Sequence, residues 1–416
     1  MSDSENAFDQ LSDLEAWRAF TREEILAYIE RFTSKKKKDK KQKARKKSGK
    51  KKKSISPVLG VRTHLRPVDV YCYLKARFGA PNGIQTMFAS DSGSMIHWDY
   101  HLKTRAGDFY VVGFTREVHF LSPESLGDDE WKKLLLALKA DFGRVGKEKS
   151  AVLKTLEKWV IFPNKFLQLA NLCADLHAQI DEHVAGYSPF NPSADIEAHT
   201  KKLDKLAERA GALYGECVQL AVLTPIVAEA FLNMLVLMLI KPEIRDKPEA
   251  YDAFVKQSIH QKILELHEKC IGFARGVDPN GEGFKNYMRI RDKRNDALHG
   301  NIDPEADRVD EVYFDDKIPL FKSPGDNIGM FWAMQERRYA PADVLKDYED
   351  MQLFLHEITL CLEPEVQQGV DTVLSDSYPG FDLGRKKLGK LFPDFVVASY
   401  LPNTRYDDEL DVTWGA

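Results

Sequence analysis

Three residues near the end of a predicted helix carry the side chains needed for chemistry on a phosphate group. The stretch 287–300 reads YMRIRDKRNDALHG and contains Arg294, Asn295 and His299. Histidine has an ordinary pKa of about 6.5, so His299 can accept and donate protons at neutral pH. The guanidinium of Arg294 is planar, always charged and able to hold two phosphate oxygens, and Asn295 lies one helical turn before His299. This set predicts proton transfer beside a bound anion.

RNA is a substrate that such residues can cut without a metal ion. Its own 2′-hydroxyl attacks the adjacent phosphate when a base removes the hydroxyl proton, a cation stabilises the phosphorus oxygens and an acid protonates the leaving oxygen. Motifs for several other chemistries are missing from the sequence, which has no HExxH, no paired CxxC and no GxxxxGK[ST]. We therefore expect neither a metal ion nor a cofactor in this site.

The arginines of this helix occupy positions where core residues are expected. An apolar stripe with helical spacing begins at positions 284, 287 and 288 and continues through Arg291, Arg294 or Asn295, and Leu298. Burial of unpaired charges is costly, so the site must offer a counter-charge, a water-filled groove or an anionic ligand. Glu229 is the only carboxylate in the most apolar segment, 218–240, and an ion pair with Arg291 or Arg294 would explain both anomalies. The alternative places Glu229 at an exposed helix edge.

The order Arg294, polar Asn295, three further residues and His299 resembles the Arg-polar-x-x-x-His signature of HEPN domains. These domains are small helical bundles, many of which are metal-independent ribonucleases, and the resemblance covers only the second half of the chain. It implies an endoribonuclease with Arg294, Asn295 and His299 as catalytic residues, while Glu229 and Arg291 are supporting candidates from the ion-pair argument. Because such domains often serve as toxins or antiviral effectors in microbes, the resemblance also implies a role in defence.

The helical positions of Arg294 and His299 bear on how such a site is assembled. Five residues correspond to roughly 500° of rotation, which places the two side chains about 140° apart around the helix. One helix does not easily aim both at the same phosphate. In the HEPN family two copies pair so that both motifs face a shared cleft, so we expect a homodimer with a composite site and RNA as its partner. The alternative is an ordinary helix end, with His299 near the helix dipole and Arg294 in solvent.

Five helices are predicted in the second half of the chain. Apolar residues recur at helical spacing over 196–220, 225–241, 248–273, 283–299 and 341–362. Thr224 and Pro225 are expected to begin the second of these helices, as its cap and its first turn. Residues 301–340 form an insertion before the last helix, within which 311–321 reads as a small hairpin.

The first half of the chain has a mixed pattern that predicts an α+β domain. Residues 66–78, 128–142 and 149–183 read as helices, whereas 95–103 and 109–120 read as an antiparallel hairpin. Residues 13–32 form an amphipathic helix or helix pair. Composition predicts a domain boundary at Gly186, Pro189 and Pro192.

The expected fold class is therefore mainly α, with an N-terminal α+β domain followed by a C-terminal HEPN-like helical bundle. The expected divisions are an N-terminal helical segment at 1–34, a lysine-rich disordered linker at 35–55, the α+β domain at 56–185, the bundle at 193–364 and a C-terminal extension at 365–416. The role of residues 56–185 is not readable from their pattern, and a further protein partner is a hypothesis for them.

A basic tract stands out from an otherwise acidic chain. Residues 35–53 hold 14 Lys and Arg against Asp39 alone, a net charge of +13, and the whole chain carries −4, which leaves −17 on the remainder. The tract has no apolar face to bury and is expected to be disordered. One hypothesis is a nucleic-acid-binding arm that acts by counterion release, through Lys35, Lys36, Lys37, Lys38, Lys50, Lys51, Lys52 and Lys53. The other hypothesis is a solubilising linker. Binding through this arm without catalysis, in a dimerisation and nucleic-acid-binding protein, is the alternative to the ribonuclease.

Cysteine usage and hydropathy bear on the compartment. The five cysteines are odd in number and far apart, which favours a reducing environment, and the polar, acidic start of the chain does not read as a signal peptide. Segment 218–240 approaches the length of a membrane span, about 20 residues. Three polar residues and one proline favour a buried bundle helix instead; they are Gln219, Glu229, Asn233 and Pro225. We therefore expect a cytoplasmic protein without a membrane partner.

Overall fold

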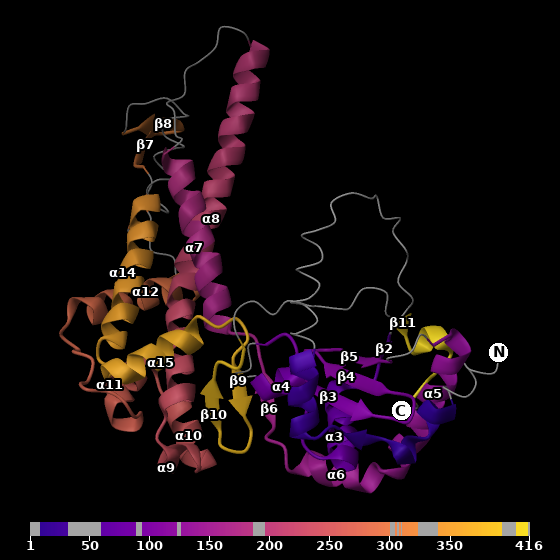
Figure 1. Ribbon diagram of the computed structural model, residues 1–416. Coiled ribbons are helices and arrows are strands. Elements are labelled where there is room, and N and C mark those ends of the chain that lie inside the picture. Colours follow the sequence, from indigo (N-terminus) through magenta and orange to yellow (C-terminus); the bar gives the residue numbers. More distant parts are fainter. Residues whose placement is uncertain are drawn as a thin grey trace, which may run out of the picture. The chain divides into compact units, whose positions relative to one another are not determined.

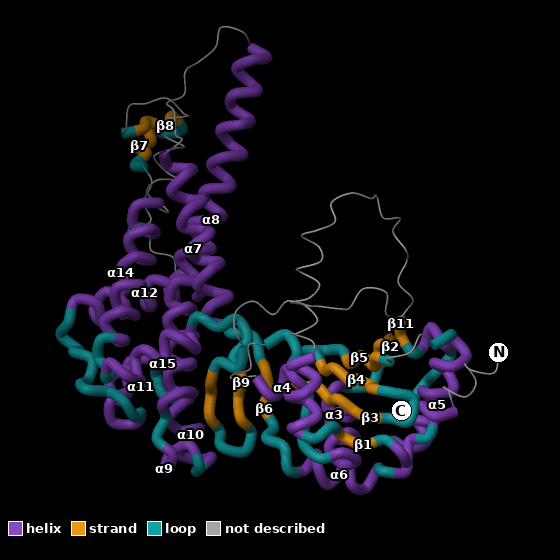
Figure 2. The backbone as a smooth tube through the Cα atoms, viewed as in Figure 1, coloured by secondary structure: helices purple, strands orange, loops and turns teal. Residues whose placement is uncertain are grey.

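The computed structural model describes residues 9–31, 60–88, 94–122, 126–185, 196–299, 304–305, 308, 310–322, 340–392 and 405–414. The chain divides into two compact units, one within residues 1–158 and 391–416 and the other within 159–390. Each unit has its own hydrophobic core. The chain is mainly α with an α+β part, as the sequence predicted (Figures 1 and 2). The lysine-rich tract at 35–53 lies outside the described residues.

The first unit contains the α+β part. Its strands are β1 (Arg18–Ala19), β2 (Gly60–Thr63), β3 (Trp98–Lys103), β4 (Asp108–Gly113), β5 (Val118–Leu121) and β11 (Arg405–Tyr406). Its helices include η1 (Leu14–Ala16), α3 (Pro67–Phe78), α4 (Ile84–Phe88), α5 (Asp128–Arg144), α6 (Gly146–Lys154) and η2 (Asp408–Leu410), and residues 9–12 and 22–31 are also helical. The strands form one sheet in the order β1-β3-β4-β5-β2-β11, in which only the β11–β2 pair is parallel.

Several local predictions for this unit are confirmed. Pro67 begins α3 and Gly79 follows it with φ of 82°, a conformation that glycine adopts without strain. β3 and β4 form the predicted hairpin. The stretch 109–120 is not one strand, because the chain reverses after β4 and Phe114 N–H donates to Glu117 O at 2.8 Å before β5 begins. Residues 13–32 are also not purely helical, since β1 joins the edge of the sheet.

The second unit is predominantly helical. Its helices are α7 (Lys165–Ala185), α8 (Ile196–Leu239), α9 (Pro242–Arg245), α10 (Pro248–Val255), α11 (Ile259–Lys269), α12 (Glu282–His299), α14 (Pro341–Thr359) and α15 (Pro364–Leu374). Its strands are β6 (Trp159–Ile161), β7 (Val312–Asp315), β8 (Ile318–Phe321), β9 (Gly380–Asp382) and β10 (Lys387–Gly389). β10, β9 and β6 make a small antiparallel sheet, and β7 pairs with β8 in the hairpin predicted within the insertion.

Four helices enclose the core of this unit. α8 runs beside α7 and also packs against α12 and α14, which contact each other (Figure 1). Fully buried side chains from these helices meet at the centre: Cys173, Ile180, Cys217, Leu220, Val227, Leu232, Leu235, Tyr287, Met351, Phe354 and Ile358. Within α7, α8 and α14 most of these residues recur at intervals of three, four or seven, which gives each helix one apolar face, and burying that face is the main stabilising term of such a bundle.

The predicted break at Thr224 and Pro225 is wrong, because α8 continues through it. Proline removes only one backbone donor, and the Thr224 hydroxyl donates to Leu220 O at 2.7 Å within the helix rather than capping a new one. Thr224 is 1% exposed, so tertiary packing of the surrounding apolar residues holds the helix together at this point. The helix predicted over 248–273 is instead two helices, α10 and α11, and Ser258 caps the second.

The division between the units differs from the boundary expected at 186–192. The region 149–183, expected to be helical throughout, contains β6 between α6 and α7, and α7 packs on α8 rather than within the α+β unit. The C-terminal extension also divides, since β9 and β10 belong to the second unit and β11 to the first. Non-local strand pairing causes both differences, because β6 is fixed by β9, more than two hundred residues away.

α8 is also the helix that raised the membrane question. Over Thr200–Leu239 it is long and apolar enough to cross a membrane by length and composition, with a most apolar window of mean hydropathy 2.1. Of that window, 56% is buried inside the structure, which agrees with a bundle core helix. All five cysteines are buried and free, so the described chain has no disulfide framework.

Candidate functional site

A polar pocket of about 290 Å³ lies where three helices of the second unit converge. α8 contributes Glu229 and Asn233, four residues apart on one face of the helix. The lining is completed by Gln257 and by Ile259 and Lys262 from the start of α11, together with Arg291, Arg294 and Asn295 from α12. The structure thus brings together four of the residues singled out in the sequence: Arg294, Asn295, Glu229 and Arg291.

α12 changes character along its length, and this change places the arginines at the pocket. Phe284, Tyr287 and Ile290 are buried, with the Tyr287 ring stacked on Phe354 at a centroid distance of 5.0 Å. The next residues on that stripe, Arg291 and Arg294, are only partly buried. The core therefore ends one turn before the arginines, so their charged heads reach the pocket while their stems cover apolar surface.

The ion pair anticipated for Glu229 is present. Arg294 Nη2 donates to Glu229 Oε1 at 2.6 Å, and the two side chains are 16% and 37% exposed. Arg294 Nε is buried without a hydrogen-bond partner. Arg291 binds instead to its neighbour Asp292, through Nε at 2.9 Å and Nη2 at 2.6 Å. Glu229 thus holds the Arg294 guanidinium by one nitrogen and leaves other donors available.

Two further cations of α12, Arg289 and Lys293, face a different helix. Arg289 Nη2 lies 2.7 Å from Asp347 Oδ1, and Lys293 Nζ lies 2.9 Å from Asp347 Oδ2, both on the side of α14. Positions 289 and 293 are one turn apart, and they lie on the opposite side of the helix from Arg291 and Arg294. The basic sequence of α12 therefore serves two purposes: one pair of cations docks the helix and the other lines the pocket.

Lys262 is the most deeply buried cation of the pocket. It is 7% exposed, and its Nζ has one hydrogen bond, a long one of 3.4 Å to Asn233 Oδ1. It forms no ion pair with any carboxylate of the described residues. Burial lowers the pKa of Lys262, an effect that Glu229 partly opposes. An ammonium group is thus held at low solvation with most of its hydrogen-bonding capacity unused.

We expect Lys262→Met to leave stability unchanged or to raise it by about 1 kcal/mol at pH 7, since burying the charged lysine opposes folding. The sign follows from the lowered pKa: the unfolded chain holds the proton more tightly, so this penalty is full at neutral pH and disappears as pH rises past the unfolded pKa. Thermal unfolding of both proteins between pH 7 and 10.5 measures the effect. A variant that is clearly less stable at pH 7 would show that the ammonium group supports the fold.

His299 is not one of the described residues that line the pocket. It is exposed at the end of α12, one turn beyond Asn295, and Leu298 beside it is 58% exposed. One helix thus presents Arg294 and Asn295 to the pocket and His299 to solvent. The structure brings the predicted cationic and amide groups together but keeps the predicted proton-transfer group at a separate exposed position.

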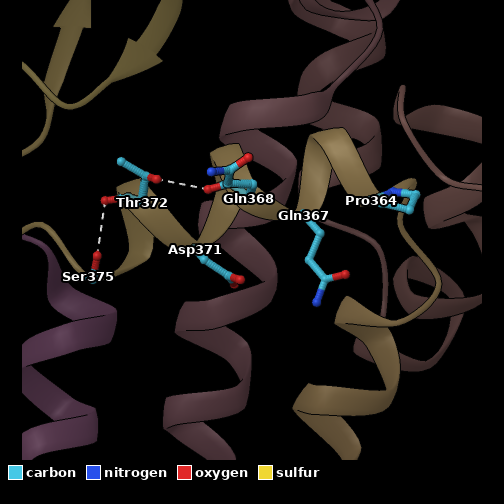
Figure 3. Close-up of a pocket in the computed structure, with 6 residues that line it drawn as sticks. All are labelled: Pro364, Gln367, Gln368, Asp371, Thr372 and Ser375. Atoms are coloured by element: carbon cyan, nitrogen blue, oxygen red, sulfur yellow. Dashed lines mark hydrogen bonds between the residues drawn. The ribbon is translucent and has the colours of Figure 1, made fainter.

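Two other places in the chain offer less for chemistry. A shallow hollow along α15 is lined by Pro364, Gln367, Gln368, Asp371, Thr372 and Ser375, and both hydroxyl groups donate to carbonyls of the same chain segment (Figure 3). In the first unit the possible metal-ligand atoms of His64, Asp407 and Asp408 lie within 4.8 Å of one another. The Asp407 carboxylate already accepts bonds from His64 N–H and Trp414 Nε1–H, which fixes the C-terminal segment to the sheet.

Sequence reasoning missed Lys262, Asn233 and Gln257 as pocket residues, although two of them left a signal. Lys262 lies on the apolar side of α11 between Ile259 and Leu266, the same anomaly that identified the arginines. Asn233 follows Glu229 by one turn in the most apolar helix. Gln257 precedes α11 and has no comparable signature. Comparison of the chain with protein-family models, curated proteins and solved structures gives no match.

Proposed function

We propose that this chain is a metal-independent endoribonuclease of HEPN type. The observation that carries the proposal is the pocket itself, in which Arg294 and Asn295 of the motif meet Lys262 and Arg291 around unused donors, with His299 one turn further along the same helix. Such a pocket favours an oxyanion, and RNA presents one phosphate per nucleotide. The action as a cytoplasmic toxin or antiviral effector is part of the proposal and follows from the motif resemblance.

The reaction requires no co-reactant. A base takes the 2′-hydroxyl proton, the 2′-oxygen bonds to phosphorus, the bond to the 5′-oxygen breaks and that oxygen receives a proton. The products are a 2′,3′-cyclic phosphate and a 5′-hydroxyl end. In this scheme Arg294 binds the non-bridging oxygens, Asn295 orients the phosphate or the imidazole, and His299 transfers protons.

Two copies of the chain are part of this proposal. Arg294 faces the pocket beside Glu229 and His299 is exposed, so one copy directs these groups to different places. A pair of copies that meet at the ends of α12 would place the His299 of each beside the pocket of the other. The exposed Leu298 next to His299 gives that contact an apolar component.

The direct test measures cleavage of total RNA in chelator by the wild type and by His299→Ala. We expect the wild type to leave 2′,3′-cyclic phosphate ends and the variant to lose at least about 10²-fold in rate, because it lacks the group that transfers protons. Lys285→Ala removes an exposed cation from the same helix, away from the pocket, and serves as the matched control that keeps full activity.

Mixing inactive subunits tests the composite arrangement. Combining His299→Ala with Arg294→Ala should restore part of the activity, since a mixed pair holds one intact Arg294 and one intact His299. Absence of cleavage by the wild type, together with RNA binding that is lost when residues 35–53 are deleted, would replace the nuclease by the non-catalytic dimerisation and nucleic-acid-binding protein.

A further inference from the structure

The pocket between α8, α11 and α12 carries more positive charge than one internal phosphate of RNA requires. Its lining holds Arg291, Arg294 and Lys262 against the single carboxylate of Glu229. Asp292, which binds Arg291, is 59% exposed and is not among the lining residues. The lining residues alone thus carry two positive charges in excess, whereas an internal phosphodiester carries one negative charge; Asp292 offsets part of the charge on Arg291 from outside the pocket.

The polar atoms of the pocket are also incompletely bonded. The donor Arg294 Nε and the acceptor Gln257 Oε1 are buried without a hydrogen-bond partner, and the donor Lys262 Nζ has only the bond of 3.4 Å to Asn233. Buried donors are nearly always satisfied in folded proteins, by the protein, by water or by a ligand. Unused donors on two separate helices, α11 and α12, indicate a common acceptor between them.

The size of the pocket limits what that acceptor can be. A volume of about 290 Å³ lies just below the usual range for small-molecule sites, about 300 to 1,000 Å³. It accommodates one phosphate with a few neighbouring atoms. The first turn of α11 supplies Ile259 and Lys262 to the lining, so the positive end of that helix dipole adds to the local field.

We propose that Lys262 binds phosphorus oxygens in this pocket and that the pocket selects a doubly charged phosphate group over a singly charged one. This inference rests on the proposed function for its meaning in catalysis. In the attack of the 2′-oxygen on phosphorus, the ground state carries one negative charge at phosphorus and the pentacoordinate state carries two when the hydroxyl proton has left. Lys262 thus adds its charge where the second negative charge develops, which lowers the barrier rather than only strengthening substrate binding.

Phosphate esters test the charge selection without any cleavage. Methyl phosphate is mostly doubly charged at pH 8, because its second pKa is about 6, whereas dimethyl phosphate carries one charge. We expect the wild type to bind methyl phosphate at least about tenfold more tightly, and Lys262→Gln to lose about tenfold in affinity for methyl phosphate with a smaller loss for dimethyl phosphate. Titration calorimetry or phosphorus NMR measures both.

Two further variants serve as controls for the phosphate-ester binding test. Lys256→Gln removes a 76% exposed lysine that pairs with Asp252 outside the pocket, and it should bind both esters like the wild type. Lys262→Arg keeps the charge and should retain the preference for methyl phosphate. Equal binding of the two esters by the wild type, or unchanged methyl phosphate binding by a folded Lys262→Gln, would overturn the proposal.

RNA cleavage separates the failure of this inference from the failure of the proposed function. For Lys262→Gln we expect kcat to fall about 10²-fold while KM changes little, since the lost interaction belongs to the transition state. If the wild type cuts RNA and this variant cuts equally fast, the nuclease stands and Lys262 is not part of it. If nothing cuts RNA but Lys262→Gln loses methyl phosphate, the dianion site stands and the nuclease does not.

Discussion

Arg294→Ala is expected to lower kcat for RNA cleavage about 10²- to 10³-fold, the usual loss when one preorganised group that stabilises developing charge is removed. The guanidinium lies in a partly buried position, fixed on one side by Glu229 at 2.6 Å and with Nε free. Because Glu229 holds it in place before substrate binds, little reorganisation is needed when charge develops at phosphorus. Single-turnover cleavage of a short RNA measures the chemical step directly.

The conservative variant sharpens this prediction. Arg294→Lys retains the charge but loses the planar fork, so it should recover only a small part of the activity. Glu229→Gln should lower activity less than Arg294→Ala, since a neutral amide still accepts a hydrogen bond from the guanidinium. Activity of Arg294→Ala equal to that of Lys285→Ala would remove Arg294 from the mechanism.

The sequence was most informative where pattern and chemistry disagreed. Arg291 and Arg294 stand on the apolar stripe of α12 and Glu229 stands in the most apolar helix, and all three line the pocket. A charged residue at a core position is costly without a partner or ligand, so such residues identify candidate binding or catalytic sites. The same argument applied to α11 would have included Lys262.

Local patterns predicted elements well and connections poorly. α3, α12 and α14 appear near their predicted bounds, because apolar periodicity and terminal residues such as Pro67, Gly79 and Pro341 act within a few residues. The continuity of α8 through Pro225 depends on packing against α7, α12 and α14, which no local window contains. The separation of β6 from its neighbouring helices depends on pairing with β9. In both cases distant contacts decide between locally similar alternatives.

The pocket could be assembled only from the three-dimensional structure, because its lining comes from three separate segments, 229–233, 257–262 and 291–295. Periodicity assigns each part to one face of its own helix but does not determine which faces meet. The buried stacking of Tyr287 on Phe354 packs α12 against α14. The partly exposed ion pairs of Arg289 and Lys293 lie on the α14 side as well, which leaves the other side of α12 toward α8 and α11. The side of α12 that packs on α14 thus determines which side lines the pocket.

Phe354→Ala should destabilise the second unit by about 3 to 5 kcal/mol, the usual cost of removing a large aromatic side chain from a core. Phe354 is fully buried in α14, where its ring stacks on Tyr287 at 5.0 Å and meets Phe284 at 6.2 Å. Both partners belong to α12, so the cavity would loosen the helix that carries the arginines. Urea unfolding of the wild type and the variant measures the difference.

The neighbouring residue provides the control for this effect. Leu353 lies on the same helix and is 61% exposed, so Leu353→Ala should change stability by less than about 0.5 kcal/mol. At a temperature where the Phe354→Ala variant is still folded, we expect cleavage to decline as well, because a displacement of about 1 Å in Arg294 is costly to catalysis. Equal stabilities of the two variants would show that the contact between α12 and α14 does not hold the pocket residues in place. The packing of α12 on α8 would then determine the geometry of the pocket.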